Sequence, residues 1–300
     1  MPRKFFTLDV FTNRAMAGNP LAVVIESEGL DDRTMQLIAR EFALSETVFL
    51  LPPTLQTTRA SLRIFTPARE LPFAGHPTVG TSVLIALLTN AGETGATFIL
   101  EEKVGLVPVA ARTIGVSAGE AIFSLPRLPE RIDDATSDVD LACALNLRTE
   151  EIGFDDHRPS VFSAGVGFTF VPVRDAATVA AARIDHSHWR EAIRPKDHAN
   201  AFVYCRETVD RGHHYHARMF APDLGIGEDP ATGSAVAAFA GVIMAYDKPV
   251  DGQHRFVIEQ GYEMGRPSQI TLEMEVKGGA LVSARVGGSA VIVSEGNLHV

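Results

Sequence analysis

The sequence predicts an α+β protein built from two similar halves, each a shell of strands around one apolar helix. Two Phe-x-Pro turns, Phe65–Pro67 and Phe220–Pro222, are each followed by a loop that contains glycine and proline. Each loop then leads into an almost wholly apolar segment, and a helix that is apolar on every side is typical of a buried position. The strand and helix patterns before both turns come in the same order, which argues against chance similarity of two short turns.

The first half is predicted to begin with two short strands and a helix, Asp31–Ala43, whose apolar residues recur at helical spacing. Further strands precede the first Phe-x-Pro turn, and a buried helix to about Leu88 follows it. A hairpin then turns around residues 101–105. The predicted strands are Phe5–Phe11, Leu21–Ile25, Thr47–Leu51, Arg59–Phe65 and the hairpin Phe98–Arg112.

The second half repeats this order. A helical stretch, Ala177–Ile193, lies among its first strands, and the buried helix Ala235–Tyr246 follows the second turn. The predicted strands are Val161–Val173 (interrupted at 163–167), Ala201–Cys205, His214–Phe220, Phe256–Glu259, Gln269–Val276, Leu281–Val286 and Ser289–Ser294.

Composition narrows the class of protein. The 300 residues include 27 Lys+Arg and 37 Asp+Glu, and the net charge of −10 disfavours nucleic-acid binding and adhesion to anionic membranes. The start lacks the pattern of a signal peptide, and no apolar run is long enough to span a bilayer. Two cysteines, Cys143 and Cys205, do not make a disulfide framework. We therefore expect a soluble cytoplasmic protein.

The loop Gly225–Ser234 carries three glycines, two acids and two hydroxyls directly before a buried helix. The first N–H groups of a helix have no helical partners, and the helix dipole adds positive potential there. Such a terminus favours a carboxylate or phosphate ligand. If the two halves are related by a pseudo-twofold axis, the two helix starts would face each other across a ligand-binding cleft.

Several named chemistries are excluded by their missing motifs. The sequence has no phosphate-binding P-loop, no dinucleotide fingerprint after its first strand, no Gly-x-Ser-x-Gly elbow and no zinc signature. His214 and His216 alternate on one predicted strand and are weak candidates for a metal site. A polar strand edge is the favoured interpretation of that segment. We expect no metal and no cofactor.

Acid–base chemistry remains. Glu46, His76 and Asp229 each stand in or beside a loop at the end of an element, where such groups can be partly buried and can transfer protons. Each also has a structural alternative: Glu46 and Asp229 as caps, and His76 as a satisfied histidine at a helix start. Together, in corresponding loops, they favour a site.

Several segments resemble one known family, the phenazine-biosynthesis PhzF-like isomerases, which share the diaminopimelate epimerase fold. The matching segments span the whole chain: Asp9–Phe11, Gly18–Val23, Ser45–Phe49, Phe65–Pro67, Phe73–Gly80 and Gly227–Ala235.

The resemblance implies a barrel-like, mostly antiparallel sheet around the central helix of each half, with the active site between the halves. It implies halves of residues 1–118, joined by a last strand at 288–300, and 119–287. A homodimer and a role in phenazine biosynthesis are further expectations. PhzF isomerises trans-2,3-dihydro-3-hydroxyanthranilate by moving a proton, without a cofactor.

The resemblance also assigns residue roles. Glu46 corresponds to the proton carrier, and His76 and Asp229 to its partners in the catalytic site. The residues implied to bind the substrate and its carboxylate are Ser45, Gly75, Gly233 and Ser234.

The related epimerases use two opposed cysteines at the helix starts, and the loop alignment puts Gly75 and Thr232 there instead. Glycine carries no proton, so we expect a single carboxylate to remove and return the proton. Two alternatives stay open: a metabolite-binding or interaction protein without turnover, and an epimerase or hydro-lyase on the same scaffold.

Overall fold

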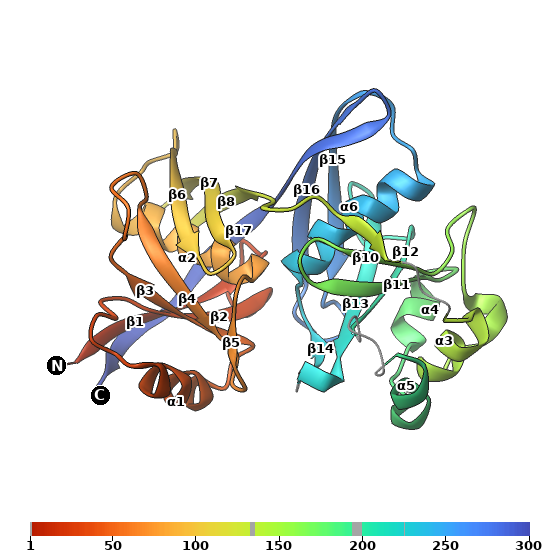
Figure 1. The fold of residues 1–300 in the computed structure, drawn as a ribbon, viewed down its shortest axis with the longest axis horizontal. Coiled ribbons are helices and arrows are strands. Elements are labelled where there is room, and N and C mark those ends of the chain that lie inside the picture. The colour runs from red at the N-terminus through yellow and green to blue at the C-terminus, as the bar shows by residue number, and fades with distance from the viewer. Residues whose placement is uncertain (1, 133–135, 194–199, 225) are drawn as a thin grey trace. The chain divides into compact units, whose positions relative to one another are not determined.

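The computed structural model describes all residues except 1, 133–135, 194–199 and 225. The chain divides into two compact units (Figure 1). The first unit consists of Met1–Pro126 and Val286–Val300, and the second of Arg127–Arg285. The domain division predicted from the sequence and the pseudo-twofold relation stay predictions. No helix among the described residues is long and apolar enough to cross a membrane.

The first unit is a closed barrel of eight strands. Each strand pairs with the next in the order β1-β2-β3-β4-β6-β7-β8-β17, and β17 returns to pair with β1 from Arg3↔Leu298 to Val10↔Ala290. The short strand β5 (Glu70–Leu71) adds to β4. The barrel strands are β1 (Arg3–Val10), β2 (Asn19–Val24), β3 (Glu46–Leu51), β4 (Ala60–Phe65), β6 (Ala96–Glu102), β7 (Gly105–Ile114), β8 (Ala118–Ser124) and β17 (Ala280–Leu298).

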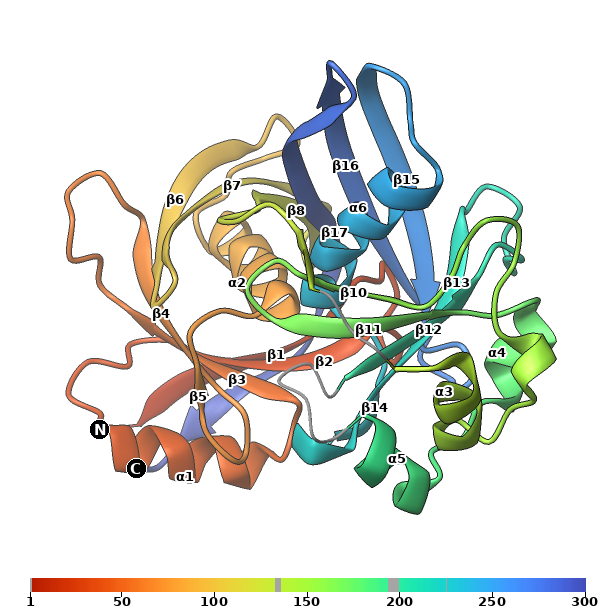
Figure 2. The same cartoon turned by 45° about the vertical axis from the view of Figure 1, so that its right-hand side comes forward.

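Helix α2 (Gly75–Leu88) lies inside this barrel (Figure 2). Its first twelve residues are all buried, as the apolar pattern predicts. Gly80 permits the close approach of helix and sheet, because a Cβ there would lie 2.6 Å from Leu21 Cδ2 and 2.7 Å from Val10 Cγ2. The helix start is therefore held firmly against the strands that surround it.

Helix α1 (Asp32–Phe42) packs on the outside of β3 and β4. Its N-cap Asp31 accepts a hydrogen bond from Thr34 N at 2.7 Å. Ala43, in the left-handed conformation, ends the helix three residues before Glu46 begins β3. The amphipathic pattern of this segment thus predicts the helix correctly and leads to the candidate acid.

The second unit repeats the succession of strand directions found in the first. From β9 to β16 the pairings are antiparallel, antiparallel, parallel, antiparallel, parallel and antiparallel, in the order β9-β10-β11-β12-β13-β15-β16. The short strand β14 (Ile226–Asp229) pairs with β13. The other strands are β9 (Glu130–Ile132), β10 (Ser160–Ser163), β11 (Gly167–Pro172), β12 (Ala201–Cys205), β13 (Tyr215–Ala221), β15 (Gly252–Gln260) and β16 (Ser268–Lys277).

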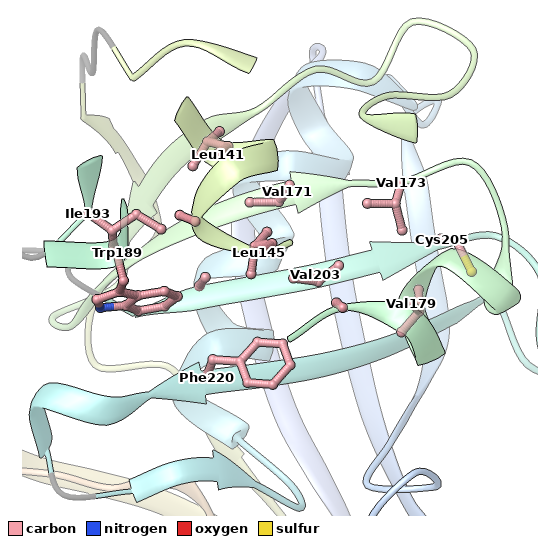
Figure 3. Packing of buried hydrophobic residues seen from close by; sticks show 13 residues of the cluster. Leu141, Leu145, Val171, Val173, Val179, Trp189, Ile193, Val203, Cys205 and Phe220 are labelled. Atoms are coloured by element: carbon pink, nitrogen blue, oxygen red, sulfur yellow. The ribbon is translucent and has the colours of Figure 1, made fainter. Parts of the chain in front are cut away.

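Helix α6 (Gly233–Tyr246) packs against β10, β11 and β16 and is buried along most of its length. The shorter helices of the unit, together with β11, β12 and β13, build a separate core around Trp189 and Phe220 (Figure 3). These helices are α3 (Asp138–Ala144), α4 (Ala176–Ala181) and α5 (His186–Ala192), and single 3-10 turns lie at Thr149–Glu151 and Pro222–Leu224.

The structure corrects four details of the predicted elements. The predicted helix Ala177–Ile193 is two helices, because Asp185 caps the N–H groups of Ser187 and His188 and so starts a new one. Residues 226–229 of the predicted loop form β14, and Gly225 lies outside the described residues. The two final predicted strands are one, β17. Sequence periodicity also missed β8, β9 and α3.

Candidate active site

Glu46 is the first residue of β3, and its side chain is 12% exposed. Because β3 runs parallel to β2, with Leu21 opposite Glu46, the first residues of both strands lie at the same end of the sheet. Asn19 begins β2 there and is fully buried. The parallel pairing therefore places an amide and a carboxylate at one rim of the barrel.

His76 joins them from the second residue of α2. Its Nδ1 lies 3.4 Å from Glu46 Oε2 and 3.4 Å from Asn19 Nδ2, and its side chain is 4% exposed. The structure thus brings together two of the three predicted catalytic residues. Gly75, the predicted ligand-binding residue, precedes His76 as the first residue of the helix. Ser45 is half-buried directly before Glu46.

The contact between His76 and Glu46 is not an ion pair at neutral pH. Burial lowers the pKa of His76 to about 3, and a hydrogen bond to the Pro20 backbone offsets only part of this effect. Whether Nδ1 donates or accepts a hydrogen bond depends on which nitrogen of the neutral ring carries the proton. With the proton on Nδ1 the ring donates to Glu46, and with the proton on Nε2 it accepts from Asn19 Nδ2.

The start of α2 is suited to an anion. Its N-cap, Ala74, makes no side-chain capping bond, and the first turn contains no acidic residue. The N–H groups of Gly75 and His76 come before the first intrahelical donor and lie at the positive end of the helix dipole. A carboxylate bound there would lie beside Glu46 and His76. The rim of the first unit therefore brings free helix N–H groups close to a carboxylate and a neutral imidazole.

In the second unit, Asp229 ends β14 and is 6% exposed. It is not the N-cap of α6: that position is Thr232, whose Oγ1 donates to Asp229 Oδ2 at 2.5 Å. Gln260 fixes this loop, because its Nε2 donates to Asp229 O at 2.7 Å and its Oε1 accepts from Thr232 N at 3.0 Å. Gly233 is buried at the first position of α6, and Ser234 follows it, half-buried.

Glu228, the other acid of this loop, has a structural role. It pairs through both oxygens with the guanidinium of Arg218, at 2.7 and 2.8 Å. Arg218 is 5% exposed and also donates to the carbonyl oxygens of Val179, Ala180 and Ala182 at the C-terminal end of α4. The pair therefore ties β14 to the end of that helix.

The histidine segment before and within β13 is not a polar strand edge, so that interpretation is wrong. His216 is 2% exposed on an internal strand, 3.0 Å from Glu259 Oε2 and 2.8 Å from Glu263 Oε1. Burial opposes its charge, but hydrogen bonds to both glutamates outweigh burial and raise its pKa to about 9. His214 accepts a hydrogen bond from Val257 N. Among the described residues, no group of three or more histidines, cysteines or acids could hold a metal ion.

Neither cysteine can serve as an acid–base thiol at a helix start. Burial raises the pKa of Cys205 on β12 to about 12, and Cys143 is exposed on α3. Counted from the helix starts, Gly75 corresponds to Gly233, one position further on than the loop alignment implies. Neither residue carries a thiol, so the chemical argument is unchanged.

Sequence reasoning missed Asn19 and Gln260, and also Glu102, whose carboxyl group is hydrogen-bonded to Thr78 in the first turn of α2. Asn19 lies in a segment that the family resemblance included, but nothing in its spacing pairs it with His76. Gln260 comes from a strand 28 residues beyond Thr232 and is found only through the fold. A charged residue closing a mostly apolar strand was the available signal for Glu102.

Comparison with known proteins identifies the family. A model described as PhzC-PhzF, phenazine biosynthesis-like protein, matches residues 8–296. The chain belongs to the PhzC-PhzF family. It is 48% identical over 303 residues to an uncharacterized isomerase of Mesorhizobium japonicum, with 99% of each chain covered. It is 31% identical over 297 residues to the trans-2,3-dihydro-3-hydroxyanthranilate isomerase of Pseudomonas aeruginosa, again with 99% of each chain covered.

Solved structures agree with this assignment. A PhzF-family protein of Bacillus anthracis superposes with a TM-score of 0.89 at 26% identity, with 100% of both chains covered. A hydroxyproline epimerase of Agrobacterium vitis, at 14% identity, shares the fold with a TM-score of 0.61, over 99% of this chain and 92% of its own. The family assignment and the predicted resemblance therefore coincide, and the named relatives in this family include isomerases.

Proposed function

We propose that this protein is a cofactor-independent isomerase in which Glu46 moves a proton between two carbons of a small carboxylate-bearing metabolite. Relatives covering nearly the whole chain carry the name trans-2,3-dihydro-3-hydroxyanthranilate isomerase. That compound has a carboxylate and a ring hydrogen to be moved, so it fits the proposed chemistry. The proposed substrate class is therefore small metabolites that carry a carboxylate. Another cyclic acid or an amino acid of this class is also compatible with the site.

The observation that carries the proposal is the contact of Glu46 with a neutral, buried histidine at the start of α2. A cationic neighbour would stabilise the carboxylate and weaken it as a base, whereas a neutral imidazole does so far less. The neutral ring still offers a donor or an acceptor to the substrate. Glu46 can then act as base and, once protonated, as acid on the same face of the substrate.

The reaction also requires that the negative charge left after proton removal be stabilised, and the start of α2 can supply this. Removing a proton next to a carboxyl-bearing carbon spreads negative charge toward the carboxylate oxygens. Fixed N–H donors at the N-terminus of α2 would stabilise that charge without reorganisation. The predicted roles of Ser45, Gly75, Asp229, Gly233 and Ser234 remain part of this proposal, since the start of α6 offers first-turn N–H groups of the same kind.

The test is exchange of substrate hydrogen with deuterated solvent, first with trans-2,3-dihydro-3-hydroxyanthranilate and then with small cyclic, amino and hydroxy acids. We expect Glu46→Gln to retain ligand affinity, since the amide keeps the size and polarity of the side chain. Its exchange rate should fall by a factor of about 10² to 10⁴, the usual contribution of a general acid–base group. Glu41→Gln, an exposed carboxylate on α1, is the matched control and should exchange normally.

Near-normal exchange by Glu46→Gln would remove Glu46 from the mechanism. Binding without exchange by the wild-type protein across the whole panel would favour a binding protein instead.

The assembly and compartment proposed from the sequence need separate support. Both cysteines are free thiols, which supports a reducing compartment such as the cytoplasm. A homodimer remains a proposal from the family resemblance.

A further inference from the structure

A second buried carboxyl group lies against the first turn of α2. Glu102 ends β6 at the turn into β7 and is 8% exposed. Its Oε1 accepts a hydrogen bond from Thr78 Oγ1 at 2.7 Å. The same hydroxyl lies 2.8 Å from the carbonyl oxygen of Ala74, the N-cap of the helix. That carbonyl oxygen also accepts from the backbone N–H of Thr78 at 3.2 Å, so the one hydroxyl proton of Thr78 is available to Glu102.

The neighbouring residue Glu101 has a structural role, and the hydrogen bonds of its carboxylate serve as a comparison for Glu102. Successive residues of a strand point to opposite faces. Glu101 accepts hydrogen bonds from the backbone N–H groups of Thr54 and Leu55 and from the hydroxyls of Thr54 and Thr58. Both of its oxygens are thus occupied in fixing the loop after β3.

Glu102 differs, because its Oε2 is fully buried and has no hydrogen-bond partner among the described residues. In the buried acids Glu101 and Glu259 both oxygens accept hydrogen bonds, and a buried polar atom left without a partner is unfavourable. An atom of this kind beside an anion-binding helix start indicates that a ligand supplies the missing partner.

The environment also determines which partner would fit. Burial raises the pKa of Glu102 to about 8, and the hydrogen bond from Thr78 offsets only part of this. No charged side chain contributes to that shift. At neutral pH the group is therefore a carboxylic acid. Because the Ala74 carbonyl oxygen already accepts from Thr78 N, the single hydroxyl proton of Thr78 can go to Oε1, and the acid proton then belongs on Oε2, which is a buried donor in need of an acceptor.

We propose that Glu102 is a substrate-binding residue of the site at the start of α2, donating a hydrogen bond from Oε2 to an oxygen of the substrate carboxylate. The inference rests on the proposed function, in which a carboxylate occupies the N-terminus of this helix. It adds a side-chain donor to the N–H groups of Gly75 and His76. A ligand anion is recognised by an acid that is itself uncharged, so no repulsion arises.

The experiment measures affinity by calorimetry at pH 6.5 with the full chain, using 3-hydroxyanthranilate, an aromatic and stable counterpart of the compound in the relatives' name. Glu102→Met keeps an unbranched side chain of similar length but has no donor. We expect it to bind about 10- to 100-fold more weakly, the effect of losing one hydrogen bond to a charged group. Glu102→Gln retains an N–H donor and should bind within about threefold of the wild type.

Glu101→Gln is the matched control: it changes the adjacent carboxylate, which accepts hydrogen bonds from the loop after β3, and should leave affinity unchanged. If Glu102→Met does not fold, as judged by circular dichroism, Glu102→Leu takes its place. Wild-type affinity in the variant without a donor overturns the inference. So does equal weakening in Glu102→Gln and Glu102→Met, because that pattern indicates altered packing.

The two proposals fail in distinguishable ways. If Glu102→Met binds normally while Glu46→Gln abolishes solvent exchange, only the role of Glu102 is wrong. If the wild-type protein binds no carboxylate of the panel, the proposed substrate class is wrong, and so is the substrate-binding role of Glu102.

Discussion

Glu102 has a consequence for stability that needs no ligand to test. The folded protein holds a proton on this carboxyl group up to a pH of about 8, whereas the unfolded chain releases it near 4.5. Raising the pH between these values therefore favours the unfolded chain, which binds fewer protons. Glu102→Gln removes this dependence because an amide does not titrate, and it keeps an acceptor for the Thr78 hydroxyl.

The size of the effect follows from the two pKa values. Each unit of pKa difference corresponds to about 1.4 kcal/mol between the protonation states. Between pH 5 and pH 7.5 the wild-type protein should lose about 3 kcal/mol of unfolding free energy relative to Glu102→Gln, from this group alone. The unfolding free energy of the variant should therefore rise relative to that of the wild type as the pH rises. Below pH 4.5 this pH-dependent difference should vanish.

The assay is urea unfolding of both proteins at pH 5 and pH 7.5, followed by circular dichroism. Trp189, the single tryptophan, lies in the core of the second unit, so its fluorescence reports that unit separately. We expect the variants to differ in the transition of the first unit and to agree in fluorescence. Glu101→Gln is the control for charge removal, because its pKa is lowered to about 2 by hydrogen bonds from Thr58, Thr54 and Leu55, and it stays ionised throughout the range.

A difference between wild type and Glu102→Gln that is the same at both pH values would refute this reasoning. It would mean that Glu102 is already ionised at pH 5 in the folded protein. The donor role proposed for its Oε2 would then also lose its physical basis.

Two further predictions concern the second unit. Gly241→Ala should lower the unfolding free energy of this unit by about 1–3 kcal/mol, because an added Cβ would clash with the Phe162 ring. Urea unfolding followed by Trp189 fluorescence measures this change. An unchanged midpoint would contradict the packing. Glu228→Gln should destabilise the same unit by about 3–5 kcal/mol, since it leaves the buried Arg218 cation without its carboxylate. Replacing both partners by apolar residues should recover much of that loss, and a double variant no better than the single one would argue against this account.

The sequence predicted those parts of the fold that depend on local patterns. Helices α2 and α6 were found because a long stretch of apolar and small residues after a loop that contains glycine and proline has few other interpretations. Helix α1 was found from its amphipathic spacing and its cap, Asp31. Glu46 and His76 were found because each lies at the start of an element, Glu46 in β3 and His76 in α2.

The missed features depend on contacts between distant segments. No local pattern distinguishes Glu101 from Glu102, although one is satisfied by its neighbouring loop and the other faces a helix. The break between α4 and α5 depends on one capping aspartate, Asp185, in a stretch with good helical composition. Pairing of β17 with β1 joins residues almost three hundred positions apart, so it was expected from the family resemblance and not from local propensity.

The electrostatics of the α2 start depend on two groups that are both uncharged at neutral pH, for the same reason. Burial lowers the pKa of the base His76 to about 3 and raises the pKa of the acid Glu102 to about 8. Between these values neither a cation nor an anion from this pair competes with the helix dipole for the ligand. Above a pH of about 8 an ionised Glu102 would repel the carboxylate that we propose to bind there, and only below about 3 would the ring of His76 become a cation. In the proposed mechanism, the burial around the first turn of α2 therefore sets the pH range in which a carboxylate would bind there beside Glu46.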